Sequence, residues 1–239
     1  MKKIVLIAFA FISVSAATAQ KEKKDFDKVF NRAGDHIMFQ ASSDHWMGAP
    51  DSINSRIKSL SRGGSIYIML NRPFKGSPHM SVAFGVGVSS SSIFFKNMSV
   101  GVTSLTTTLP FTNLDSSDHF KKYKLNTTYL EAPIELRYTT DPLNENKSFK
   151  IALGVKVGTL LNAHTKGKSP EDKTDASINS YTEKENSKRF INSTRLSATA
   201  RVGYGHYSLF GTYQINSVFK TGVAADIKLF TVGFCLSGL

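Results

Sequence analysis

The chain has 239 residues, 41% of them hydrophobic, and a formal net charge of +12. This length and composition suit one folded domain and exclude a disordered or fibrous chain. Cys235 is the only cysteine, which excludes an intramolecular disulfide and a cysteine-based metal cluster. A basic balance can favour nucleic-acid binding, but the chain has no basic stripe interleaved with stacking aromatic residues, so we expect no nucleic-acid partner.

The N-terminus has the pattern of a secretory signal peptide. Two lysines precede an uncharged apolar run over residues 4–14, and a small-residue A-x-A site ends at Ala19. The run is too short for a transmembrane helix, which needs about 20 apolar residues. We therefore predict an exported protein with a signal peptide over residues 1–19, cleaved after Ala19 or Gln20, and a short periplasmic segment over residues 20–34.

The rest of the chain, residues 35–239, contains runs that alternate apolar with small or polar residues, a period typical of β-strands. In one of them Val82 and Phe84 fall on one face, and Ala83 and Gly85 on the other. In chain order the predicted strands cover residues 35–41, 64–71, 80–89, 130–138, 149–161, 195–204, 207–215 and 230–237. Most approach the 9 to 11 residues that a tilted membrane-spanning strand requires.

The connections between these strands alternate in length. Long polar connections cover residues 42–62, 89–126 and 164–188, and short turns lie around residues 72–76, 140–144 and 203–206. Short periplasmic turns and long outer loops are typical of outer-membrane barrels. We therefore predict an all-β fold, an eight-stranded antiparallel up-and-down transmembrane β-barrel in the outer membrane of a Gram-negative cell envelope.

Details at the strand ends support this orientation. Five tyrosines are predicted to form an interfacial aromatic girdle, namely Tyr67, Tyr129, Tyr138, Tyr204 and Tyr207.

The serine run over residues 89–92 and the Lys/Glu-rich stretch over residues 166–188 are predicted to be mobile loops rather than linkers between domains.

The polar faces of several predicted strands carry charges of both signs. The predicted lumen charge network consists of Glu131, Glu135, Arg137, Lys156, Arg195 and Arg201. Charge inside a narrow barrel is costly unless it is paired, and eight strands enclose a space just wide enough for their own side chains. We expect this network to be structural, with a polar conduit or a binding site as the alternative, and we expect no bulk transport.

Residues 129–138, with the sequence Tyr-Leu-Glu-Ala-Pro-Ile-Glu-Leu-Arg-Tyr, resemble the "YLEIPLLLKY" strand of PorT-like outer-membrane β-barrel proteins. The resemblance implies the barrel fold and the outer-membrane location. Some members of that family are linked to secretion or gliding, and most have no assigned role. Glu135 stands where an apolar residue is usual. Pro133 lies inside the strand, where proline removes a ladder donor, so we predict a β-bulge there.

Three sets of residues in or beside the outer loops could carry catalysis: Asp44 with His45, Asp118 with His119, and His164. None of them lies in a nucleophile motif such as G-x-S-x-G or a metal-binding motif such as H-E-x-x-H. We therefore expect no enzyme, no catalytic residue, no cofactor and no metal site.

The outer loops are also predicted to be basic. One carries Lys121, Lys122 and Lys124, and another carries Lys166 and Lys168, which suit anionic lipopolysaccharide groups or, in the alternative, a solvated loop. The favoured function is a structural or interaction barrel, an accessory of an envelope or secretion assembly, whose partners are outer-membrane lipid, lipopolysaccharide and other envelope proteins. The alternatives are an exported soluble β-barrel that binds a small apolar ligand and an outer-membrane lipid-modifying enzyme.

Overall fold

The computed structural model describes residues 37–238, apart from residues 75, 143, 145 and 146. The predicted signal peptide (1–19) and the segment over residues 20–34 lie outside the described residues. Within the described part of the chain, no helix is long and apolar enough to cross a membrane.

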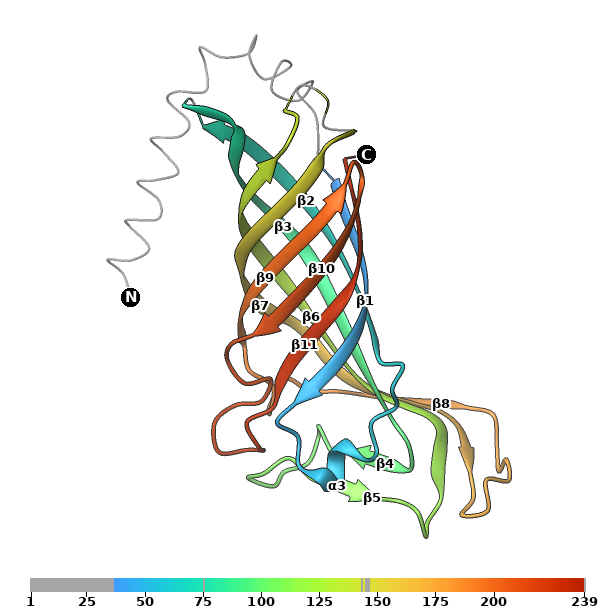
Figure 1. Ribbon diagram of the computed structural model, residues 1–239. Helices are drawn as coiled ribbons and strands as arrows, with labels where there is room; N and C mark the ends of the chain where they lie inside the picture. The colour runs from blue at the N-terminus through green and yellow to red at the C-terminus, as the bar shows by residue number, and fades with distance from the viewer. Residues whose placement is uncertain (1–36, 75, 143, 145–146, 239) are drawn as a thin grey trace, which may run out of the picture. The chain divides into compact units, whose positions relative to one another are not determined.

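Eight strands form a closed antiparallel ring (Figure 1). They are β1 (Ile37–Met47), β2 (Arg62–Phe74), β3 (Ser77–Phe95), β6 (His119–Thr139), β7 (Phe149–Glu171), β9 (Thr194–Tyr204), β10 (Tyr207–Gln214) and β11 (Lys228–Ser237). Their spatial order is β6-β3-β2-β1-β11-β10-β9-β7, and pairing of β6 with β7 closes the ring. Closure leaves no free edge among these strands, and the predicted eight-stranded antiparallel barrel is confirmed.

Alternation along each strand separates an apolar outside from a more polar inside. In β7, Leu153 and Val155 are 59% and 44% exposed, whereas Ala152 and Lys156 are buried. The exposed apolar belt includes Ile66, Ile68, Phe84, Val86, Leu130, Ile134, Leu136, Ile151, Leu153, Val155, Val157, Val202, Leu209, Val232 and Phe234. Water is a poor solvent for so large an apolar surface, and a barrel whose backbone is fully paired can present it to hydrocarbon.

The tyrosines divide between the two faces. Tyr138, Tyr204 and Tyr207 are exposed at the end with the short turns, as expected of an interfacial girdle. Tyr67 and Tyr129 are fully buried, so assigning them to the girdle was wrong. The physical reason is the alternation of side chains along a strand, since both tyrosines occupy inward-facing positions.

Several strands run past the apolar belt, which corrects the predicted loop boundaries. β3 continues to Phe95, so the serines at 89–92 belong to a strand and not to a mobile loop. The strands β6 and β7 remain paired from His119 opposite Glu171 down to the belt, because inward side chains such as Leu125 support an apolar core at this end. A fourth long connection, over residues 215–227, joins β10 to β11 and was not predicted.

The long connections fold into an ordered cap over the outer end of the barrel (Figure 1). They carry α3 (Asp51–Asn54), β4 (Met98–Val100), β5 (Phe111–Asn113) and β8 (Thr182–Asn186). Trp46 lies at the centre of the cap, with ring centroids 5.6 Å from Phe95, 6.5 Å from Phe111 and 5.4 Å from Phe219. These edge-on contacts join the outer ends of β1 and β3 to two of the connections in one apolar core.

The prediction of a β-bulge at Pro133 is wrong. Pro133 lies opposite Lys156 in unbroken register with β7, while the ladder with β3 skips Ala132 and Pro133 and resumes in the same register. Proline has no N–H to donate, and the β3–β6 ladder has a local gap at this position without a change of register. The register shift in β6 lies between Thr128 and Tyr129 instead.

Candidate functional site

One half of the interior network is built around Glu131. Its carboxylate accepts hydrogen bonds from Arg195 Nη1 at 3.2 Å and from the Tyr67 hydroxyl at 2.6 Å. Lys156 Nζ donates to the Tyr67 hydroxyl and to Gln40 Oε1, both at 3.2 Å. All five side chains are buried inside the barrel, where paired hydrogen bonds offset part of the cost of desolvating the charges.

The other half is built around Glu135. Arg137 Nε lies 2.9 Å and Arg201 Nη2 lies 3.2 Å from the same carboxylate oxygen. Arg201 also donates to Ser208 and Ser237. The six residues predicted for the lumen are therefore all buried and are brought into two acid-centred clusters.

Two interior partners, Tyr67 and Gln40, were not among the predicted site residues. The signal that could have found them is the alternation of their own strands, which points both inward. Small residues opposite the acids complete the packing. A Cβ atom at Gly154 would lie 3.0 Å from Glu135 Cγ, and one at Gly158 would lie 2.9 Å from Glu131 Cγ.

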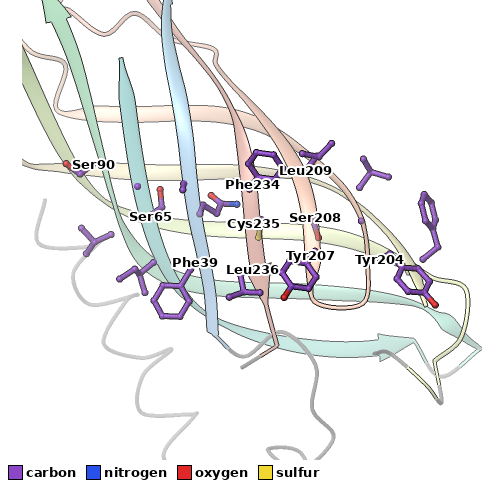
Figure 2. Close-up of a pocket in the computed structure, with 18 residues that line it drawn as sticks. Phe39, Ser65, Ser90, Tyr204, Tyr207, Ser208, Leu209, Phe234, Cys235 and Leu236 are labelled. Carbon is purple, nitrogen blue, oxygen red and sulfur yellow. The ribbon is translucent and has the colours of Figure 1, made fainter. Parts of the chain in front are cut away.

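The interior leaves little space for a ligand. A cavity beside Glu131 and Lys156 measures about 30 Å³, which is room for one or two water molecules. The larger apolar hollow lies on the outer wall, where Phe39, Leu209 and Phe234 are exposed (Figure 2). An apolar occupant of this hollow would therefore sit on the lipid-facing side, and the described residues do not support a soluble barrel with an apolar ligand inside.

Six cations lie on nearby strands above the apolar belt, and we name this set the basic strip. It consists of Arg62 in β2, Lys122 and Lys124 in β6, Lys166 and Lys168 in β7, and Lys184 in β8. Strand pairing sets lysine directly opposite lysine, as Lys122 with Lys168, Lys124 with Lys166, and Lys166 with Lys184. Like charges at directly opposed positions destabilise a sheet, so a bound anion would relieve this repulsion.

Burial, and after it the neighbouring positive charges, disfavour the protonated form of groups in and beside the basic strip. Burial, followed by the charges of Lys166 and Arg62, lowers the pKa of Lys124. Burial, followed by nearby lysines that include Lys184, also lowers the pKa of His164. Glu183 and Glu185 alternate with Lys184 along β8 and so face the other side of the sheet.

The structure changes the setting of the predicted lysines. Lys122, Lys124, Lys166 and Lys168 lie in paired strands rather than in loops. Lys121 is not part of the basic strip, because its Nζ lies 3.2 Å from Glu171 Oε1.

The candidate catalytic pairs are not assembled as pairs. Asp44 is buried and accepts a hydrogen bond from Ser42 at 2.8 Å, whereas His45 is exposed and contacts the Ser43 hydroxyl at 3.0 Å. Asp118 is likewise exposed beside the buried His119. His164 is half-buried in β7, and the charges near it are those of Lys184, Lys124 and Lys166 rather than of a carboxylate. Alternation along a strand sends neighbouring side chains to opposite faces, so adjacency in sequence does not build a dyad here.

Comparison with known proteins agrees with the observed barrel fold. Residues 18–220 match the model of a family described as "Outer membrane protein beta-barrel domain". The chain belongs to this family. As a member of the outer membrane protein beta-barrel domain family, it is a transmembrane protein of the outer membrane.

Solved structures similar to this family member include two of Ail, the attachment invasion locus protein of Yersinia pestis. One, in complex with the heparin analogue sucrose octasulfate, is 12% identical, covers 86% of this chain and 97% of that chain, and has a TM-score of 0.39. The other is 14% identical, with the same coverage of both chains and a TM-score of 0.36. No curated protein matches the chain.

Proposed function

We propose that this outer-membrane barrel is a non-enzymatic interaction protein whose basic strip binds phosphate groups of lipopolysaccharide. The observation that carries the proposal is the run of directly opposed lysines, Lys124 opposite Lys166 and Lys166 opposite Lys184. A sheet that stacks its own positive charges gains stability from an anion, and lipopolysaccharide presents phosphates beside the barrel wall.

The height of the strip on the barrel suits this ligand. Along β7 the last exposed apolar residue is Leu161, and Lys166 follows five residues later. That separation is about 16 Å along the strand and about 12 Å along the membrane normal for a tilted strand. The hydrocarbon core gives way to headgroups over roughly 5 to 8 Å. By this estimate the strip lies just beyond the headgroup layer, level with the sugars of lipopolysaccharide, on the outward face.

The test compares two triple variants of the purified barrel. One carries Lys124→Met, Lys166→Met and Lys184→Met, and the control carries Lys96→Met, Lys173→Met and Lys220→Met at exposed loop positions. Each lysine near an anionic surface contributes about 1 kcal/mol, so the strip variant should bind immobilised lipopolysaccharide about 100-fold more weakly. The control should bind as the unmodified protein does. Equal losses in both variants, or binding that is unchanged on dephosphorylated lipopolysaccharide, would contradict the proposal.

A second candidate function, docking of an envelope protein on the cap, is favoured by Leu105. This side chain is 88% exposed. Its segment is held by Arg189, which donates to the carbonyl oxygens of Ser104, Leu105 and Thr106 at 3.2 Å each. Burial of this apolar side chain by a partner would be favourable, and its fixed position lowers the entropy that binding costs. Native pull-down with quantitative mass spectrometry should lose that partner in Leu105→Asp and retain it in the control Leu60→Asp.

Three finer assignments belong to the same proposal. The resemblance at residues 129–138 supports a PorT-like protein that acts as an accessory of an envelope or secretion assembly. Residues 1–19 are proposed to be a cleaved signal peptide, which N-terminal sequencing of the exported protein would test. The buried acid and base clusters are proposed to be structural, and the measurements for Glu135 in the Discussion test that role.

A further inference from the structure

A buried histidine and two carboxylates meet at the outer end of β6 and β7. One ligand-type atom from each of His119, Glu171 and Asp175 lies within 4.8 Å of the others. His119 and Glu171 are 5% and 7% exposed, whereas Asp175 is exposed. Three donors of this kind, one nitrogen and two oxygens, are a set that a divalent transition ion accepts.

Two structural features position the three residues: the paired ends of β6 and β7, and the turn that follows β7. His119 is the first residue of β6 and pairs directly with Glu171, the last residue of β7. Asp175 follows in a tight turn in which Asp172 Oδ1 accepts hydrogen bonds from the backbone N–H groups of Thr174 and Ala176. Asp175 itself has a positive φ of 64°, a conformation that this turn stabilises. The turn thereby brings the Asp175 carboxylate over the strand pair.

Both ring nitrogens of His119 face hydrogen-bond acceptors. Nδ1 lies 3.2 Å from the carbonyl oxygen of Ser117, and Nε2 lies 3.1 Å from Asp175 Oδ1. Both neighbours are acceptors, but a neutral imidazole has only one N–H to donate. If Nδ1–H donates to the carbonyl oxygen, the Nε2 lone pair faces a carboxylate. That contact is favourable only with a second proton on the ring or with a cation between the two groups.

We propose that His119, Glu171 and Asp175 form a binding site for one Zn²⁺ ion or a similar divalent transition ion. A histidine that donates Nδ1–H to a backbone carbonyl oxygen and offers Nε2 to the metal is a recurrent arrangement in metal sites. Zn–N and Zn–O bonds of about 2.0 to 2.2 Å place tetrahedral ligand atoms about 3.4 Å apart, close to the separation of Nε2 and Oδ1. Three protein ligands leave a fourth position for water or for a group from a partner.

Lys121 is the competitor at this site. Its Nζ lies 3.2 Å from Glu171 Oε1, and its side chain is 64% exposed, so it can swing into solvent when a metal binds. The bound ion would join the turn over residues 172–176 to the paired ends of β6 and β7. It would thus stabilise one side of the cap.

The test uses the full barrel folded in detergent, titrated with Zn²⁺ by calorimetry and with Co²⁺ by visible absorption. The unmodified protein should bind one ion per chain, and Co²⁺ should show the intense bands of a tetrahedral site. His119→Gln and Asp175→Asn should each weaken binding at least tenfold. His45→Gln, which removes an exposed histidine beside an aspartate, is the matched control and should bind normally.

Lys121→Met supplies an independent readout, because it leaves all three ligands in place. Loss of the competing ammonium should tighten Zn²⁺ binding by about threefold to tenfold. Heat-modifiable gel mobility checks that every variant is folded. If the unmodified protein binds no ion, or if His119→Gln binds as tightly as His45→Gln, the proposal is overturned and the contact is an imidazolium–carboxylate ion pair only.

Discussion

Replacement of Glu135 by glutamine should destabilise the barrel more than replacement of either arginine that contacts it. The Glu135 carboxylate is 2% exposed, and one of its oxygens accepts hydrogen bonds from both Arg137 and Arg201. Glutamine preserves the shape but removes the negative charge that both guanidinium groups share. Removing one partner of a buried ion pair costs about 3 to 5 kcal/mol, so we expect the free energy of unfolding to fall by that amount.

The opposite substitution, Arg201→Met, should cost less. Glu135 retains Arg137 at 2.9 Å, so its charge stays compensated. Four of the six charged residues in the network are basic and two are acidic, so loss of a base reduces an excess of positive charge. The expected loss is that of a charge-assisted hydrogen bond, about 1.5 to 3 kcal/mol.

Urea unfolding of the barrel in phospholipid vesicles, followed by circular dichroism and by heat-modifiable gel mobility, measures both effects. Glu183→Gln is the matched control, because it makes the same chemical change on an exposed face of β8 and should shift stability by less than about 0.5 kcal/mol. The reasoning is refuted if Glu135→Gln costs no more than Glu183→Gln. It is also refuted if Arg201→Met proves more damaging than Glu135→Gln.

Three further predictions concern packing and the cap. Gly154→Ala places a Cβ atom 2.2 Å from a backbone oxygen and should lower the free energy of unfolding by about 1 to 3 kcal/mol, whereas Gly211→Ala meets nothing within 4 Å and should be nearly neutral in the same urea assay. Phe219→Ala opens the cap, so Trp46 emission should shift to longer wavelength and outer-loop proteolysis should accelerate, while gel mobility still shows a folded barrel. A side-chain hydrogen bond from Arg56, in the loop after β1, lowers the pKa of Asp115 to about 2. Its stabilising contribution is therefore complete above the usual carboxyl pKa and is lost as the pH falls through about 2. Asp115→Asn should be cleaved faster than the unmodified protein by trypsin at pH 7, and pepsin at pH 2 should cleave the two at nearly equal rates.

The barrel could be predicted from the sequence because its signals are local. A period of two in β7, with Leu153 and Val155 against Lys156, is visible within a few residues and decides both the strand and its faces. The same parity locates the charged residues inside. Tyr67 shows the limit, because a tyrosine near a strand end suits both a girdle and the interior, and only its position in the strand decides between them.

What could not be predicted depends on contacts between residues far apart in the chain. Lys156 lies 89 residues from Tyr67 and 116 from Gln40, so its hydrogen bonds follow from ring closure and not from any local motif. His119 and Asp175, 56 residues apart, meet only because strands β6 and β7 remain paired beyond the belt. The cap could not be predicted from these polar connections, since its apolar residues occur singly or in short groups, such as Phe190 with Ile191, spread through four connections.

The arrangement of the interior argues that the active surfaces of this protein lie outside the barrel. Along the barrel axis the described residues present the acid and base clusters first and then the apolar core around Trp46, and the cavity between the network residues is only about 30 Å³. A hydrated ion or solute would have to break the Glu131 and Glu135 pairs and then cross an aromatic layer that offers it no hydrogen bonds. A solute would meet both barriers in turn, so recognition is left to the outer end of the barrel, where the paired lysines of the basic strip and the exposed Leu105 lie.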